Sequence, residues 1–106
     1  MTITIEDKKD SPTLIIIQDE MTIYNVLEHK KKLYPYLKNE KSLQIDLSNV
    51  SEIDSAGMQL LIFFKYQSQI EKKEITFIEH SESVMEVVNI FSFSSFFDIP
   101  VISSAN

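Results

Sequence analysis

The residues with the clearest chemical potential are Asp54 and Ser55, which stand in the run Ile53-Asp54-Ser55-Ala56-Gly57 beside the only glycine of the chain. A serine at the start of a helix can carry a phosphate, because the first-turn N–H groups and the helix dipole stabilise an anion there. It can instead act as a plain N-cap, which is the commoner role of such a serine. Phosphorylation would add roughly −1.5 to −2 charges beside Asp54 and would change any partner interface at this point.

Two elements must position this run. The alternation of apolar and polar residues from Leu43 to Leu47 predicts a half-buried strand, and residues 48–52 are typical of a connecting loop. Downstream, the pattern predicts a helix from Ser55 to about Lys72 with Asp54 or Ser55 as its N-cap.

This helix is apolar on two nearly opposite sides. The arc that we expect to face a sheet consists of Gly57, Leu60, Leu61, Phe64 and Ser68. The second arc consists of Ser55, Gln59, Ile62, Phe63, Tyr66 and Ile70. One sheet cannot cover both arcs, so we expect the second to form a partner face continuous with Ser55. The alternative is that flanking helices bury it.

The segment from Ile45 to Leu61 resembles the signature of STAS domains, the family of bacterial anti-sigma factor antagonists, and the resemblance extends over nearly the whole chain. It implies a single STAS domain over residues 1–106 with an α/β fold. That fold is a mixed sheet of four or five strands with about three helices packed mainly on one face. In the family, the residue matching Ser55 is phosphorylated by a partner serine kinase, and the unmodified form binds that partner.

The same match assigns the neighbouring residues. Asp54 flanks the phosphosite, Gly57 permits close approach of the partner, and Asp46 matches a common strand-end aspartate of the family. The resemblance and the second arc together predict the partner-binding residues Asp46, Asp54, Ser55, Ala56, Gly57, Gln59, Ile62, Phe63 and Tyr66. The implied partner is a serine-kinase anti-sigma factor or a related regulator, and that partner supplies ATP and magnesium. The chain would then be a cytoplasmic phosphoprotein in signal transduction and transcription regulation, and a homodimer is left open.

Two features differ from the best-known antagonists. Many of those carry Gly-Glu-Leu-Asp where this chain has residues 19–24, and the final helix of those antagonists is not expected here. Both features resemble stand-alone STAS proteins found alongside chemotaxis systems and the small STAS subunits of lipid-transport ABC complexes. A constitutive accessory subunit of either assembly is therefore the alternative function. A small-ligand binder or enzyme is the third hypothesis.

Composition narrows the function classes. The net charge of −6 disfavours nucleic-acid and anionic-membrane binding, since both require a basic surface. The chain has no cysteine, which excludes disulfides and thiolate metal sites, and no signal peptide or membrane span is predicted. His29, expected on a helix surface, and His80, expected at a strand end, have no catalytic spacing. We therefore predict a protein that is not an enzyme, with no catalytic residue, metal or cofactor.

The remaining segments predict a hairpin followed by the order α, β, α, β, α. Met1 to Ile5 is predicted as the first strand, and Leu14 to Ile17 as a strand buried on both faces. Thr22 is expected to cap a helix that Pro35 ends or kinks near Leu33 or Tyr34. The apolar stripe of that helix is expected to be Ile23, Val26, Leu27 and Leu33.

The C-terminal part of the chain predicts one more strand and one more helix. Ile75 to Ile78 is the predicted strand, and Ser81 is the predicted cap of the helix. Its inward-facing residues are expected to be Val84, Val87, Val88 and Phe91. Most rings of the aromatic run at 91–97 are expected to pack inside, and one or two exposed rings would extend a partner surface.

Overall fold

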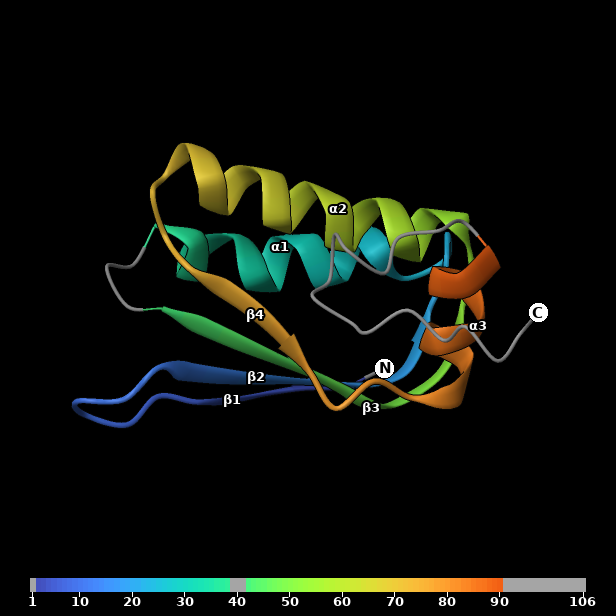
Figure 1. Ribbon diagram of the computed structural model, residues 1–106, viewed down its shortest axis with the longest axis horizontal. Helices are drawn as coiled ribbons and strands as arrows, with labels where there is room; N and C mark the ends of the chain where they lie inside the picture. Colours follow the sequence, from blue (N-terminus) through green and yellow to red (C-terminus); the bar gives the residue numbers. More distant parts are fainter. Residues whose placement is uncertain (1, 39–41, 91–106) are drawn as a thin grey trace.

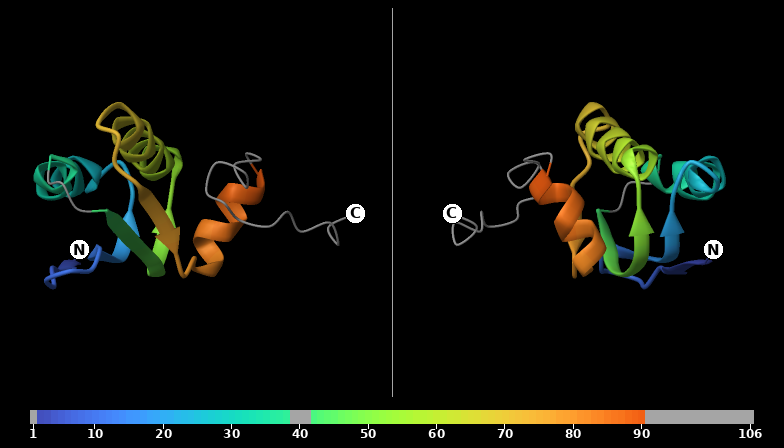
Figure 2. Two further views of the ribbon diagram at one scale, coloured as in Figure 1. Left: turned by 60° about the vertical axis from the view of Figure 1, so that its left-hand side comes forward. Right: turned by 90° about the vertical axis from the view of Figure 1, so that its right-hand side faces the viewer.

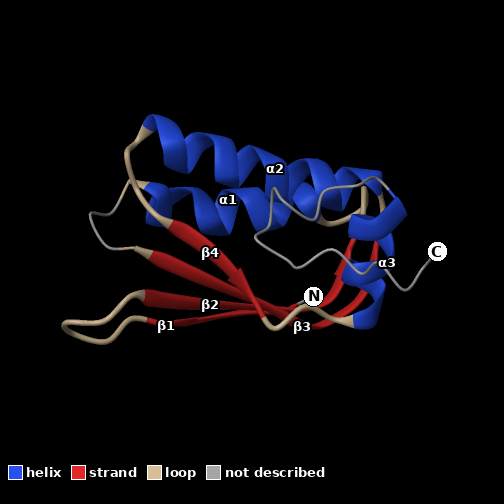
Figure 3. Ribbon diagram, in the orientation of Figure 1, coloured by secondary structure: helices blue, strands red, loops and turns tan. Residues whose placement is uncertain are grey.

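The structure is a computed structural model that describes residues 2–38 and 42–90. Within these ranges a four-stranded sheet is combined with three helices (Figures 1 and 3). The elements are β1 (Thr2–Glu6), β2 (Thr13–Met21), α1 (Val26–Leu37), β3 (Leu43–Ile53), α2 (Ser55–Ile70), β4 (Ile75–Ile78) and α3 (Glu82–Ile90). The predicted order of a hairpin followed by α, β, α, β, α is confirmed.

The sheet has the strand order β1-β2-β3-β4, with β1 antiparallel to β2 and the other pairs parallel. The predicted mixed α/β architecture is thus confirmed, with β2 and β3 as its central strands. Right-handed crossovers place α1 and α2 on one face of the sheet (Figure 2). Helix α3 lies beside the second half of β3, where the Ser83 hydroxyl donates to the Ser51 carbonyl (2.8 Å), and just before the helix Ser81 N–H donates to the Leu47 carbonyl (3.1 Å).

Burial along β2 shows how the helices cover the sheet. Ile15 and Ile17 are fully buried, whereas Leu14 and Ile16 are half-buried. The prediction that this strand is buried on both faces is wrong, because α1 and α2 cover only the face that carries Ile15 and Ile17. The apolar run therefore reflects strand propensity as well as burial.

Strand β3 is longer than its alternating segment indicated. Residues 48–52, predicted as a loop, belong to the strand and pair with the end of β2, where Asp19 lies opposite Val50 and Met21 opposite Ile53. Two register shifts interrupt this pairing, so the buried positions of β3 stop alternating after Leu47. A period of two could not identify the second half of the strand for this reason.

Helix α1 begins later than predicted. Asn25, not Thr22, occupies the N-cap position, because residues 22–25 form a turn in which Thr22 N–H donates to Asn25 Oδ1 (2.8 Å). Val26 is half-buried and Leu33 is buried as expected, but Ile23 and Leu27 are each 64% exposed. The predicted stripe is therefore wrong for Ile23, which precedes the helix, and for Leu27, because the inner face of α1 carries the buried residues at intervals of four from position 29.

Helix α1 continues past Pro35 to Leu37, so the prediction that the proline ends it near Leu33 or Tyr34 is wrong, and the alternative of a kink stays a prediction. The backbone bond that a proline removes would join residue 35 to the carbonyl of Lys31, and both residues are exposed, so water can bond to that carbonyl. Leu33 and Leu37 hold the helix to the core on both sides of the proline. His29, predicted at the surface, is fully buried because it shares this inner face at intervals of four residues.

The other two helices follow their predicted patterns. Helix α2 ends at Ile70, two residues before the predicted end, and its inner arc is buried throughout, with Met58 added. In α3, the Ser81 hydroxyl accepts a bond from Val84 N–H (3.2 Å), so the predicted cap is confirmed. Val84 and Val88 are fully buried and Val87 is half-buried. The predictions for Phe91, the aromatic run and the absent final helix lie outside the described residues.

Candidate functional site

The two central parallel strands determine where α1 and α2 begin. The C-terminal ends of β2 and β3 lie at one edge of the sheet, and each is followed by the start of a helix (Figure 1). Ser55 is the first residue of α2 and is exposed at this edge. The structure thus presents the predicted phosphate acceptor to solvent at a helix N-terminus.

Asp54 is the N-cap of α2, so of the two predicted N-cap candidates, Asp54 and Ser55, the structure selects Asp54. One carboxylate oxygen, Oδ1, accepts a bond from Gly57 N–H (3.0 Å). The other, Oδ2, accepts a bond from Ile23 N–H (2.9 Å) in the turn before α1. A single side chain therefore joins the start of α2 to a segment 31 residues earlier. The Ser55 hydroxyl is not required as a cap.

The surroundings of this carboxyl group favour its charged form. Desolvation raises the pKa of Asp54, but backbone N–H bonds outweigh that effect and leave the pKa below its usual value of 3.8. The N–H groups responsible are those of Ile23, Gly57, Ala56 and Asp54. A second negative charge on Ser55 would thus arise beside a group that stays ionised.

Gly57 is buried, and its φ is not positive. A Cβ at this position would lie 2.2 Å from the carbonyl oxygen of Met21 and 2.7 Å from Cγ1 of Ile53. The glycine is therefore needed where α2 begins against the ends of β2 and β3. The close approach that requires this glycine is that of the protein's own backbone at Met21. The prediction that Gly57 also permits close approach of a partner stays a prediction.

The structure brings most of the other predicted partner-binding residues together on α2. Gln59, one turn after Ser55, and Tyr66, about three turns after it, are exposed, and Ala56, Ile62 and Phe63 are half-buried. Phe63 packs against α1, with its ring 6.4 Å from the Tyr34 ring and 4.3 Å from Nζ of Lys30. The second arc of α2 is thus partly covered by a flanking helix, as the alternative stated, and partly exposed.

Asp46 is not brought to this surface. It lies in the middle of β3 on the face of the sheet opposite the helices, where its Oδ1 accepts a bond from Ser48 N–H (2.9 Å). Its role as a partner-binding residue stays a prediction, but it cannot share one flat contact area with the outer side of α2.

Sequence reasoning missed an apolar surface on the turn before α1 and on α1 itself. Tyr24 is 92% exposed, and Ile23 and Leu27 are each 64% exposed. The bond from Ile23 N–H to Asp54 places this surface next to the start of α2. The apolar spacing is visible in the sequence and predicts an inward stripe, but exposure depends on which face of α1 packs against the core.

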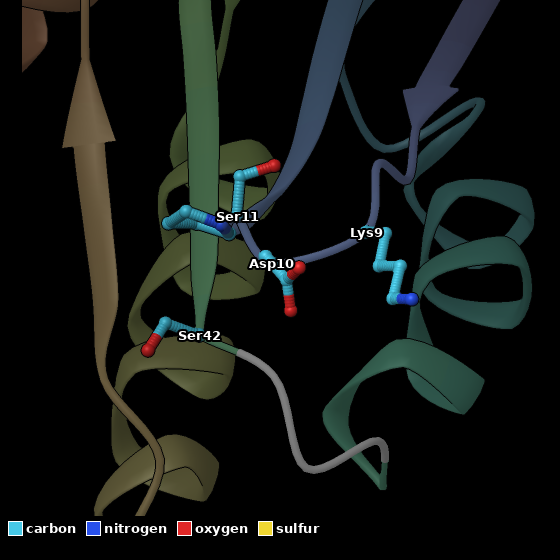
Figure 4. A pocket seen from close by; sticks show the side chains of 5 residues that line it. Lys9, Asp10, Ser11 and Ser42 are labelled. Atoms are coloured by element: carbon cyan, nitrogen blue, oxygen red, sulfur yellow. The ribbon is translucent and has the colours of Figure 1, made fainter.

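A hollow of about 510 Å³ lies at the other end of the molecule, next to the β1–β2 turn. Lys9, Asp10, Ser11 and Ser42 line it, and their polar ends do not converge on a common point (Figure 4). Within the described ranges, no three His, Cys, Asp or Glu side chains are grouped to hold a metal ion. No helix there has the length and apolar character that a bilayer span requires. The start of α2 is thus the candidate site.

Solved structures share this fold over almost their whole length. An anti-sigma factor antagonist from Mycobacterium paratuberculosis is 17% identical with a TM-score of 0.80, and the match covers 98% of this chain and 89% of that one. The antagonist SpoIIAA in its unphosphorylated form is 13% identical with a TM-score of 0.74, covering 98% and 92%. The Bacillus SpoIIAA structure in the phosphorylated form is 12% identical with a TM-score of 0.70, covering 98% and 96%.

A family model described as "Mlab, STAS domain" matches residues 5–99 of this chain. This match includes every described strand and helix in full except β1, of which only residues 5 and 6 are matched, and the run from Asp54 to Gly57 lies inside it. The fold, the position of that run at the start of α2 and the family match agree, and the protein belongs to the STAS domain family.

Proposed function

We propose that this protein is a phosphorylation-regulated binding module of the anti-sigma factor antagonist type. In its unmodified form it binds a serine-kinase-type regulator in the cytoplasm, and phosphorylation of Ser55 releases it. The observation that carries the proposal is the exposed Ser55 hydroxyl at the first position of α2, directly after a cap that does not need it. The phosphorylated form of SpoIIAA, a protein of this fold, supports the same chemistry.

The chemical step requires no catalytic group from this chain. The Ser55 oxygen forms a bond to the γ-phosphorus of ATP, the bond from that phosphorus to the ADP oxygen breaks, and the hydroxyl proton passes to a base of the kinase. The product carries a phosphate beside the ionised Asp54. Charge repulsion and the cost of desolvating the phosphate then lower the affinity for a partner whose surface fits the neutral serine.

Mass spectrometry after incubation with the cognate kinase and ATP tests the acceptor. We expect a single phosphate on Ser55 and none on the Ser55→Ala variant, which should be folded and remain bound to the kinase. Ser55→Asp should weaken binding by about tenfold or more, because the added charge meets a desolvated interface. Ser11→Asp, at the opposite end of the molecule, is the matched control for charge and should bind normally.

A second function is favoured by the description of the matching family model, which names Mlab. In this alternative the chain is a constitutive accessory subunit, and the surface around Ser55 docks without phosphate turnover. Phosphate on another residue, or wild-type affinity of Ser55→Asp for the kinase, would refute the switch. A stable complex with an ABC ATPase that forms equally well with both Ser55 variants would then support the subunit function.

A further inference from the structure

Helices α1 and α2 lie side by side over the sheet (Figure 2), and two adjoining hollows of about 280 and 580 Å³ lie between them. Leu27, Lys30 and Phe63 line both hollows, which meet where Nζ of Lys30 lies over the Phe63 ring (4.3 Å); the two hollows together are here called the α1–α2 groove. Its near end also includes Ala56 and Gln59, next to Ser55, and its far end includes Tyr34 and Gln67. The groove thus begins at the proposed phosphosite.

The groove is apolar and solvent-accessible. Leu27 is 64% exposed and Tyr34 is 40% exposed, while Ile23 and Tyr24 project from the turn before α1. Among the described residues, these four account for most of the exposed large hydrophobic side chains; the other two are Tyr66 and Ile70 on α2. Exposed apolar side chains gathered on one part of a surface mark an interaction site.

The charge of this layer is opposite to that of the whole protein. Helices α1 and α2 carry four lysines and one acidic residue, namely Lys30, Lys31, Lys32, Lys65 and Glu28. The two helices are therefore net positive, although the complete chain has a net charge of −6. Lys30 and Lys31 line the groove directly. An occupant with negative charge is favoured by this arrangement.

We propose that the α1–α2 groove binds an amphipathic helix of the partner protein, with apolar side chains in the groove and acidic residues beside Lys30 and Lys31. A ridge of side chains on a helix fits between two neighbouring helices, and this is a recurring mode of peptide recognition. A recessed groove suits such a ridge better than it suits the flat surface of a bilayer. The inference rests on the proposed function, since it names the chemistry of the partner at the same surface.

Photo-crosslinking in the native host identifies the occupant. A benzophenone amino acid replaces Leu27 in the groove, and the control carries it at Thr4, on the sheet face opposite the helices. We expect the Leu27 position, and not the Thr4 position, to yield a cross-linked peptide whose sequence alternates at helical spacing between apolar and acidic residues. Cross-links to lipid, to a second copy of this chain, or to a peptide without acidic residues would overturn the proposal, as would the absence of a cross-link.

Affinity measurements with the cross-linked partner test the charge requirement. The double variant Lys30→Glu, Lys31→Glu should bind about tenfold more weakly or worse, with a loss that shrinks at high salt. The double variant Lys9→Glu, Lys72→Glu makes the same change in net charge away from the groove and should bind within about twofold of the wild type. Equal losses in both variants would refute a specific role for the groove.

The same assay separates this inference from the phosphorylation switch. If Ser55→Asp releases the partner while Lys30→Glu, Lys31→Glu does not, the groove proposal fails and the switch stands. If the lysine variant releases the partner while Ser55→Asp does not, the groove proposal stands and the switch fails. Circular dichroism of each variant confirms that the fold is retained.

Discussion

The two ends of α2 are built in different ways. At its N-terminus, Asp54 bonds both to Gly57 within the helix and to Ile23 in a distant turn, and Gly57 packs against the Met21 carbonyl. At its C-terminus, Lys72 has a positive φ of 56°, and the N–H groups of Lys72 and Lys73 bond to carbonyls of the last turn. The first end is held by tertiary contacts and the second mainly by local ones.

The C-terminus of α2 only has to end the helix, whereas its N-terminus also has to position Ser55. The C-terminal bonds form a Schellman-type ending, in which Lys73 N–H donates to Ser68 (2.8 Å) and Lys72 N–H donates to Gln69 (3.2 Å). Such an ending provides hydrogen-bond donors for the last carbonyls of the helix. It also accommodates Lys72 at a positive φ, a conformation that glycine adopts more readily. The N-terminal end must keep Ser55 and the turn before α1 in a fixed relation, so its residues are more constrained.

Gly57→Ala should have the largest effect, because the added Cβ would lie 2.2 Å from a backbone oxygen that only a shift of β2 or α2 can relieve. We expect the free energy of unfolding to fall by about 3 kcal/mol in urea titrations. Gln69→Ala, at an exposed position near the other end of α2, should change it by less than about 0.5 kcal/mol. Helix propensity alone would make Gly57→Ala more stable by about 1 kcal/mol, so a gain would contradict the packing argument.

Asp54→Ala should have the next largest effect, because it leaves both Gly57 N–H and Ile23 N–H without their acceptor. We expect a loss of about 2 kcal/mol in the free energy of unfolding. Amide hydrogen exchange should accelerate at Ile23 and Gly57, with no change at Lys73. Unchanged exchange at Ile23 would show that the turn before α1 does not depend on the carboxylate.

Acid should weaken the N-terminal end of α2 selectively. The pKa of Asp54 is lower in the folded protein than its usual value of 3.8, so its stabilising contribution is complete above that value and is lost as the pH falls through the folded pKa. The difference in unfolding free energy between the wild type and Asp54→Asn should therefore shrink below pH 3.8. Burial lowers the pKa of His29, so stability falls below pH 6.5 in both proteins, and the difference isolates Asp54. A difference that is constant with pH would contradict this assignment.

Lys72→Gly should have the smallest effect and the opposite sign. Glycine adopts a positive φ without the steric cost that Lys72 carries, but it also gains more freedom in the unfolded chain. We expect a net gain of about 0.5 kcal/mol in the free energy of unfolding. Gln69→Gly, inside α2, is the matched control and should lose about 1 kcal/mol. A loss at Lys72 as well would mean that its conformation is not strained.

The parts of the fold that depend on local pattern could be predicted from the sequence. The alternation in Leu43 to Leu47, the inner arc of α2 and the Ser81 cap each depend on neighbouring residues, and each is confirmed. The failures occur where distant contacts outweigh local signals. Residues 48–52 became strand because the bulged end of β2 pairs with them, and α1 continued past Pro35 because Leu37 lies in the core.

For the candidate site, the sequence by itself determined the chemistry: a serine between an acidic residue and the only glycine, at the start of an apolar helix. Only the tertiary structure decided that Asp54 is the cap, that Gly57 faces Met21, and that exposed residues of α1 adjoin Ser55. Residue types and spacing determine helix periodicity and capping potential, because these act within a few residues. Exposure and neighbourhood depend on how β2 and β3 bring segments 31 residues apart to the same edge of the sheet.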